Sequence, residues 1–434
     1  MRVTPTGARR PHHRPPVPGN HPSRVGCHAE HRPDRRVRAL DVTALITDPY
    51  GTYARLREAA PVHRITGPDG LPAWLVTRYD DVRAALADPR LSLDKRNAAP
   101  GGYSGFSLPP ALDANLLNMD PPDHTRVRRL VAKAFTPGRV DKLREPVREV
   151  AGQLLDAVEA EGRADLVAAY AAPLPITVIC DLLGVPQEDR LDFRAWTDAL
   201  IAPDPGRPHL MKEAVGNMMR FFTGLIASKR ADPRDDLLSD LIAVRDGEGD
   251  GTADRLSEDE LSSLAFLILF AGYENTVQLI GNAVLALLDH PELMRGLRAD
   301  PGGLGAAVEE INRWDGPAPL AIRRFPLEDL EIGGVTVPAG ETVLLSLASA
   351  NRDPHHFAEP ERLDPNRART GQLGLGHGIH YCLGAPLARM ETETALAALL
   401  ERLPGLTLDV PREELEWRPS MRARGLISLP VRWG

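Results

Sequence analysis

The chain has 434 residues, 43% of them hydrophobic, and a formal net charge of −8. This length exceeds the usual size of a single-core domain, so either two lobes or one large fold is expected. Nine of the arginines lie in residues 1–40, which leaves an acidic remainder and argues against nucleic acid as a partner. The three cysteines, Cys27, Cys180 and Cys382, have no zinc-site spacing, so a reducing, cytoplasmic setting is expected.

Residues 1–40 differ from the rest of the chain in being rich in Arg, His and Pro. Such a segment cannot bury a core, and we predict a disordered basic extension ahead of one globular domain at residues 41–434. It contains no long apolar run, so we predict neither a signal peptide nor a membrane anchor. Contact of this extension with nucleic acid or anionic lipid is the alternative to simple solvation.

The globular part opens with short elements and a long connection. We predict a helix at Tyr50–Ala59, two strands at Val62–Thr66 and Ala73–Thr77 joined by a turn, and a helix at Tyr79–Ala87. The segment Asn97–Asn118 has little periodicity and several Gly and Pro residues, which predicts a loop. Long loops inside compact domains are commonly binding loops or lids.

The run Met119–Phe135 is predicted to be a helix that is entered through two prolines. His124 and Arg128 lie four residues apart and therefore share one face of this helix. Arg129 and Lys133 form a second such pair beside the first. Without further information, the pattern is typical of a solvated basic helix face. More helices are predicted downstream, at residues 140–158, 174–183, 186–201 and 210–229, with a Pro/Gly-rich break at 202–208.

The most apolar segment is Ser257–Leu288, which begins with a capping box formed by Ser257 and Glu260. From Leu261 to Leu288 the only charged residue is Glu274. A helix that is apolar on nearly all sides is buried all round, and about thirty residues make a rod of roughly 45 Å. The strongly apolar run within it is too short to span a membrane. A lone acid in a buried helix needs a partner or a task.

A charged pair and two further arginines follow this helix. Glu310 and Arg313 lie three apart on a predicted helix face, which alone indicates a salt bridge of little energy. Short strands are predicted between residues 329 and 346, around Gly- and Pro-containing turns. Arg324 precedes these strands and Arg362 follows them. Beyond Arg389 we predict a helix to residue 403 and short strands to the end of the chain.

Glycines recur at every second position from Gly374 to Gly378, ahead of Cys382. Repeated glycines suit a backbone that bends sharply and approaches a flat, bulky group. Because Cys382 directly precedes a predicted helix, the helix N-terminus favours its thiolate, which suits a metal ion. A lone cysteine is more often simply buried. A Cys/His hydrolase using Cys382 with His377 or His380 is a further alternative, but no oxyanion pattern accompanies it.

This segment resembles the haem-ligand signature of the cytochrome P-450 family. The signature is carried by Gly376, Gly378, His380, Cys382 and Gly384, with Leu375 where Phe is usual. The resemblance implies Cys382 as the thiolate ligand of the iron in haem b (iron protoporphyrin IX), with Gly376, His380 and Gly384 beside the cofactor. It implies a mainly α fold with minor β, in which a long central helix lies over the haem and small sheets lie at one side.

Other motifs of the family occur in the same order along the chain. His124, Arg128 and Arg324 match residues that hold the haem propionates, and the loop before them would cover the substrate. Arg129 and Lys133 would face outward toward an acidic electron donor. Glu310, Arg313 and Arg362 match a buried structural network near the haem. The helix pair around residues 186–229 would form a mobile roof over the substrate.

On the long helix, the resemblance identifies a segment that manages water and proton delivery to dioxygen. It contains Gly272, Glu274, Asn275 and Thr276. Gly272 would let the haem and oxygen approach the helix backbone. Asn275 stands where an alcohol is usual, and Thr276 is one residue late, which is about 100° of rotation on a helix. Asn can still donate and accept hydrogen bonds, so we expect oxygen activation to persist. The replacement of the usual alcohol by Asn275 also favours a peroxide-driven route, uncoupling of oxygen consumption from product formation, or a proton relay through substrate hydroxyls.

The resemblance therefore implies a soluble, monomeric, cytoplasmic monooxygenase with no membrane partner. It would insert one oxygen atom of O2 into a bulky, largely apolar small molecule of secondary metabolism, such as a polyketide or terpenoid, by hydroxylation or epoxidation. A thiolate ligand favours O–O cleavage on haem iron. No flavin or iron–sulfur segment occurs, so electrons are expected from a separate ferredoxin and ferredoxin reductase. The alternatives are a non-oxidising haem-binding or recruitment module and a peroxide-driven oxidase.

Overall fold

The computed structural model describes residues 42–67, 69–103, 108–132, 135–201, 207–246, 255–368 and 371–434. The predicted extension at residues 1–40, Lys133 and most of the predicted break at 202–208 lie outside these described residues.

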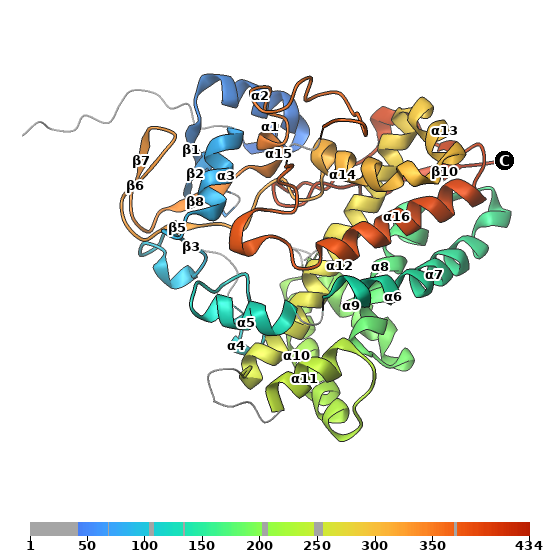
Figure 1. Cartoon of the computed structure of the whole chain (residues 1–434), viewed down its shortest axis with the longest axis horizontal. Coiled ribbons are helices and arrows are strands. Elements are labelled where there is room, and N and C mark those ends of the chain that lie inside the picture. Colours follow the sequence, from blue (N-terminus) through green and yellow to red (C-terminus); the bar gives the residue numbers. More distant parts are fainter. Residues whose placement is uncertain are drawn as a thin grey trace, which may run out of the picture. The chain divides into compact units, whose positions relative to one another are not determined.

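Helices make up most of the described chain, as predicted (Figure 1). They are α1 (Val42–Thr47), α2 (Pro49–Ala59), α3 (Tyr79–Ala87), α4 (Pro110–Asp113), α5 (Asp123–Ala132), α6 (Pro137–Lys142), α7 (Arg144–Asp156), α8 (Pro173–Leu183), α9 (Arg190–Ile201), α10 (Pro208–Ala231), α11 (Leu237–Asp246), α12 (Glu258–Asp289), α13 (Pro291–Ala299), α14 (Leu304–Asp315), α15 (Leu347–Ala350) and α16 (Ala385–Arg402).

The strands are short and form small sheets. One sheet pairs β1 (Val62–Thr66) antiparallel with β2 (Pro72–Val76) and β2 parallel with β8 (Thr342–Leu345). The predicted hairpin of β1 and β2 therefore gains a third strand, β8, from far along the chain. The other pairings join β10 (Pro430–Arg432) to β4 (Arg163–Asp165) and β9 (Thr407–Leu408), β3 (Leu91–Ser92) to β5 (Phe325–Pro326), and β6 (Leu330–Ile332) to β7 (Val335–Val337).

Helix α12 is central to the main hydrophobic core. It begins with the predicted capping box, in which Ser257 and Glu260 exchange side-chain and backbone hydrogen bonds. The helix, yellow in Figure 1, contacts α4, α8, α10, α14 and α16. It is the one described helix long and apolar enough to cross a membrane, but 61% of its apolar window is buried inside the protein. That burial is what a core helix of a soluble protein shows.

Several boundaries differ from the predictions for local reasons. The helix predicted over residues 140–158 is split at Leu143 into α6 and α7, because Pro146 lacks an N–H and cannot continue a helix from α6. The helices α11 and α13 were not predicted. The predicted loop at residues 97–118 contains the short helix α4, which packs against α12. Just after α4, Asn115 Nδ2 donates to Ser263 Oγ at 3.0 Å. The described part of this loop is therefore tied to the start of α12.

Candidate functional site

The segment around Cys382 is a tight loop between the β8–α15 region and α16. Gly376 and Gly378 have φ values of 78° and 73°, which only glycine adopts readily. A Cβ on Gly378 would lie 3.1 Å from Leu86 O and 3.2 Å from Ala87 Cα, at the end of α3. The loop is closed by a hydrogen bond from Cys382 N to Leu375 O at 2.9 Å. Glycine at these positions therefore fixes where the cysteine stands.

Cys382 lies three residues before α16 and is half-buried. Burial raises the pKa of its thiol, whereas a backbone N–H of Gly384 and the guanidinium groups of Arg128 and Arg389 lower it. Gly384 has an ordinary backbone conformation, and a Cβ there would contact no described atom. The described residues contain no group of three or more His, Cys, Asp or Glu placed to hold a metal.

Four basic side chains gather beside this loop. His124 and Arg128 come from α5, Arg324 from the segment before β5, and His380 from the loop itself. The rings of His124 and His380 are 4.1 Å apart, and Arg128 Nη2 donates to Tyr381 O at 2.6 Å. The sequence predicted all four as cofactor contacts, and the fold does bring them together.

Of these bases, His124 and Arg324 are buried and Arg128 and His380 are partly buried, and none of the four makes an ion pair in the described part of the chain. His124 is 1% and Arg324 4% exposed. Both ring nitrogens of His124 and Nε of Arg324 lack a hydrogen-bond partner. Burial lowers the pKa of His124 to about 4 and that of Arg324 to about 10, with Asp120 opposing both shifts. Buried donors without partners are costly, so the cluster fits a ligand carrying negative charge.

On α12, neighbouring residues occupy different environments. Asn275 is exposed, as is Ala271 one turn before it, and Asn275 Nδ2 lies 3.4 Å from Ala271 O. Thr276 is 3% exposed, and its hydroxyl donates to Gly272 O at 2.7 Å. The open face of the helix therefore presents an amide, and the threonine hydroxyl is already satisfied by the backbone.

Gly272 packs against a neighbouring helix. A Cβ on this residue would lie 3.1 Å from Ile179 Cδ1 of α8. The absence of a side chain therefore permits close packing of α12 on α8. The predicted role, an approach of cofactor and oxygen to the helix backbone, stays a prediction.

Glu274 has a partner that the sequence did not reveal. Arg418 Nη1 lies 3.7 Å from Glu274 Oε1, and both side chains are mostly buried. Burial raises the pKa of Glu274, and the guanidinium of Arg418 opposes that shift. Arg418 comes from the C-terminal segment, so no local pattern could have paired the two residues.

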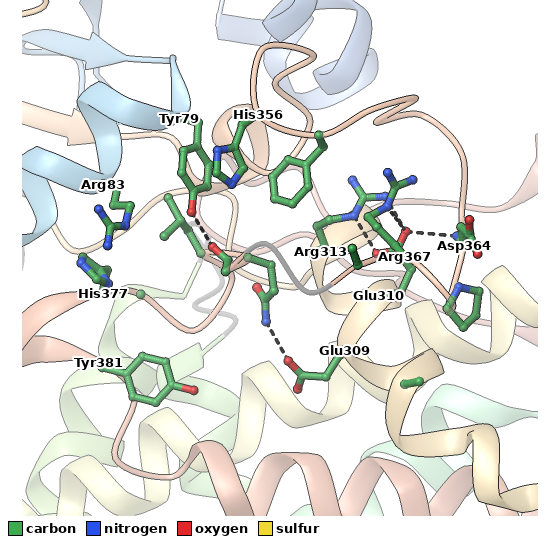
Figure 2. Close-up of a pocket in the computed structure, with 18 of the residues that line it drawn as sticks. Tyr79, Arg83, Glu309, Glu310, Arg313, His356, Asp364, Arg367, His377 and Tyr381 are labelled. Carbon is green, nitrogen blue, oxygen red and sulfur yellow. Dashed lines mark hydrogen bonds and ion pairs between the residues drawn. The ribbon is translucent and has the colours of Figure 1, made fainter.

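The predicted Glu310–Arg313 pair exists, but its third member is different. Arg313 donates from Nε and Nη2 to both carboxylate oxygens of Glu310, at 2.8 and 2.7 Å. Arg367 Nε donates to Glu310 Oε1 at 3.0 Å, as Figure 2 shows. The side chain of Arg362 is 63% exposed and pairs with Glu359 and Asp364 instead. The prediction for Arg362 is wrong because only its backbone carbonyl contacts Arg313.

Comparison with known proteins identifies the family. A cytochrome P450 model matches residues 304–421. The chain is 48% identical over 400 residues to cytochrome P450 monooxygenase PikC of Streptomyces venezuelae. The matched residues cover 91% of this chain and 94% of that protein. This chain is 44% identical over 403 residues to 6-deoxyerythronolide B hydroxylase of Saccharopolyspora erythraea, with 91% and 98% covered. The chain belongs to the cytochrome P450 family.

Solved structures of cytochromes P450 agree. The tirandamycin C-bound P450 monooxygenase TamI has a TM-score of 0.82 and 44% identity, covering 91% of this chain and 100% of that one. Myxobacterial CYP267B1 in complex with myristic acid has a TM-score of 0.84 and 42% identity, covering 90% and 98%. The predicted P450 fold and the assignment to the oxidoreductases, as a monooxygenase, are confirmed.

Cytochromes P450 bind haem through a cysteine thiolate, and the residues present fit that group. A haem carries two propionates, and the cluster of His124, Arg128, Arg324 and His380 supplies basic side chains for them, with buried nitrogens of His124 and Arg324 that lack hydrogen-bond partners. Of the two described cysteines, only Cys382 has two guanidinium groups, those of Arg128 and Arg389, that lower the pKa of its thiol. Cys180 is buried in the core, and burial raises its pKa to about 12.

A cavity of about 610 Å³ lies between α3, α14 and the Cys382 loop (Figure 2). In its wall, Glu309 accepts hydrogen bonds from Gln372 and from Arg389, and Arg389 Nη2 donates to Tyr381 Oη at 3.1 Å. This link between α14, α16 and the residue before Cys382 was missed from the sequence. Glu309 and Arg389 each lie next to motif residues, but nothing in their spacing pairs them.

Proposed function

We propose that this cytochrome P450 uses haem b, with Cys382 as the axial ligand, to insert one atom of O2 into a bulky, largely apolar small molecule. The observation that carries the proposal is the arrangement of Cys382 beside four bases that make no ion pair among the described residues, two of which, His124 and Arg324, are buried. A thiolate-ligated haem, when bound, supplies O–O cleavage and oxygen insertion. The chain's own residues bind the cofactor, orient the substrate and move protons.

In this proposal the basic cluster retains the cofactor. Arg128 and Arg324 would pair with the propionates, and His124 and His380 would donate hydrogen bonds to them. Glu310 and Arg313 would hold the surrounding fold, with Arg367 in place of Arg362. The partly exposed Glu274 would carry protons from solvent toward the open face of α12.

Asn275 favours a second candidate route within the same site. Because Thr276 donates its hydroxyl to the backbone, no alcohol from this segment faces the open side of α12. Asn275 Nδ2 and Oδ1 would orient water there instead. A site without that hydroxyl is expected to couple oxygen consumption to product less tightly, or to use peroxide directly. Comparison of peroxide-driven with reductase-driven turnover distinguishes the two routes.

The substrate class is proposed from the relatives. One is named 6-deoxyerythronolide B hydroxylase, another mycinamicin IV hydroxylase/epoxidase and a third polyketide biosynthesis cytochrome P450. Residues 318–322 resemble the family strand that lines the substrate pocket, and the exposed Ile322 in this segment suits an apolar molecule of this kind. Spectral titration with 6-deoxyerythronolide B, tirandamycin C and myristic acid tests the proposal. A high-spin shift with the polyketides and none with the fatty acid supports it.

Electrons are proposed to come from a ferredoxin and its reductase, to a monomeric cytoplasmic enzyme. Arg129 of α5 is exposed and would face an acidic donor. Reversal of its charge in R129E should raise the salt-sensitive KM for ferredoxin, because fewer opposite charges then steer association. Unchanged kinetics would dispose of this docking role.

The decisive experiment for the cofactor is the carbon monoxide difference spectrum of the reduced protein. We expect the absorption of a thiolate-ligated haem, lost in C382S and kept in C180S. An imidazole-type spectrum, or full turnover by C382S, would refute the proposal. Colourless, haem-free protein would favour the Cys/His hydrolase. Haem binding without oxygen consumption would favour the non-oxidising module.

A further inference from the structure

The C-terminal residues 417–426 fold back on themselves. Trp417 and Leu426 form an antiparallel bridge, and Arg418 N donates to Gly425 O at 2.9 Å. The guanidinium of Arg424 lies 3.3 Å from the centroid of the Trp417 ring. We refer to residues 417–426 as the C-terminal hairpin. These contacts fix the backbone of the hairpin and therefore the position from which the Arg418 side chain extends.

Helix α12 holds this hairpin through two polar residues. Asn282 Nδ2 donates to Arg424 O and to Asp315 O, both at 3.0 Å. Gln278 lies against Gly425 so closely that a Cβ on that glycine would overlap its amide. Gln278 and Asn282 are 2% and 1% exposed, so these contacts are in the interior.

Asp315 fastens the hairpin from a second helix. Arg424 Nε donates to Asp315 Oδ1 at 3.1 Å, and Arg424 N donates to Pro317 O at 2.8 Å. Asp315 ends α14, so both α12 and α14 fix the hairpin. The base of the loop that carries Arg418 is therefore rigid.

Glu274, Gln278 and Asn282 are spaced by four residues and share one face of α12. The same face that grips the hairpin thus presents Glu274 to it. Arg418 Nη1 stands 3.7 Å from Glu274 Oε1, with side chains 28% and 20% exposed, and Arg418 makes no other ion pair among the described residues. Tyr273 lies beside them and donates to Asp198 of α9, which also pairs with Arg194.

Glu274 therefore points away from the open face of α12, although Asn275, the next residue in the sequence, lies on that face. We propose that Arg418 is a positioning residue that holds the Glu274 carboxylate charged and directed toward the C-terminal hairpin, from where it takes up a proton. Gln278 and Asn282 serve by keeping the hairpin in place. This inference rests on the proposed role of Glu274 in proton delivery.

The proton balance gives the expected consequence. Glu274 accepts one proton from solvent, releases it toward the open face and returns to the carboxylate. Arg418 favours that charged state because the opposite charge is close and partly shielded from water. Without the guanidinium, burial raises the pKa of Glu274 with no opposing charge. The carboxyl group then keeps its proton to higher pH and releases it slowly.

The test uses the holoenzyme and three variants. R418Q removes the charge, R418K keeps it, and R412Q removes an arginine that contacts Asp289 at the far end of α12, at 3.1–3.2 Å. The readout is infrared titration of the protonated carboxyl band, assigned by its loss in E274Q. R418Q should raise the pKa of Glu274 by about one unit, while R418K and R412Q leave it close to the wild-type value.

Activity and salt provide independent readouts. With an added ferredoxin and its reductase, the pH optimum of oxygen consumption should move upward in R418Q by a similar amount. In the wild type, raising salt should raise the Glu274 pKa, and in R418Q it should not, because salt screens the attraction between Arg418 and Glu274, which solvent partly reaches. The salt comparison keeps the inference testable in the wild-type protein if R418Q does not fold.

The outcomes separate this inference from the proposed function. An R418Q protein with a thiolate-type carbon monoxide spectrum and an unshifted Glu274 band overturns the inference alone. If E274Q itself leaves the pH profile unchanged, the role of Glu274 and the inference fall together. Loss of the thiolate-type spectrum in wild-type protein overturns the proposed cofactor site.

Discussion

Glu309 of α14 and Arg389 of α16 form an ion pair one contact away from Cys382. Arg389 also donates to Tyr381 Oη at 3.1 Å, and Tyr381 immediately precedes the cysteine. The pair thus fixes the loop and balances a positive charge that acts on the thiol.

The first prediction follows from that balance. In E309Q the charge of Arg389 is no longer offset, so the thiolate is stabilised and donates less electron density to the iron. We expect a higher reduction potential, measured by spectroelectrochemical titration. Because both side chains are about a third exposed, the loss of unfolding free energy should stay below about 1 kcal/mol. E292Q, which removes an exposed acid of α13 paired with Arg295, is the matched control. Equal potentials in E309Q and E292Q would contradict the prediction.

The second prediction compares two neighbouring arginines. R367A removes a 13% exposed guanidinium from Glu310 and should lower the free energy of unfolding by about 1–3 kcal/mol, since a buried carboxylate loses one of its two arginine partners. R362A removes a 63% exposed side chain and should change it by less than about 0.5 kcal/mol. Urea unfolding of both holoproteins measures the difference. A larger loss in R362A would show that the sequence-based assignment was correct after all.

The contrast between these arginines shows where sequence reasoning ended. Glu310 and Arg313 pair within one helix, so their spacing sufficed to predict the contact. The third arginine follows a turn at Glu359, whose φ is 46°, and it is Arg367 that reaches Glu310 from this segment. Spacing carries no information about that turn, and the motif pointed to Arg362 in place of Arg367.

The same distinction applies to the fold. Helix α12 and helix α3 follow from local periodicity and capping, and the structure has them close to the predicted bounds. The β2–β8 pairing and the Glu274–Arg418 contact join segments far apart in sequence. Such contacts depend on how the core packs, so only the structure reveals them.

The third prediction concerns the open face of α12. N275T places a hydroxyl where Asn275 is now exposed, and it should lower the hydrogen peroxide released per O2 consumed severalfold by improving proton delivery. T276A removes a buried hydroxyl that donates only to Gly272 O, so coupling should hardly change. Peroxide release is measured with a ferredoxin, its reductase and any ligand that gives a spectral shift. Equal effects of both substitutions would show that the rotational position of the side chain is irrelevant.

The fourth prediction concerns Glu391 of α16, which is 2% exposed and whose Oε1 has no hydrogen-bond partner among the described residues. Burial raises its pKa to about 8, from the ordinary value of 4.5. The folded state therefore holds the proton more tightly than the unfolded state, and the contribution of Glu391 to stability is greatest below pH 4.5.

Between pH 4.5 and 8 the unfolded chain releases this proton first, so the free energy of unfolding should fall by up to about 1.4 kcal/mol per pH unit from this group. E391Q keeps a neutral side chain of the same shape and removes that slope. Urea unfolding should show that the free energy of unfolding of E391Q, relative to that of the wild type, is higher at pH 8 than at pH 5. E401Q, on the same helix, serves as the control. A parallel decline in wild type and E391Q would mean that Glu391 is ionised inside the fold.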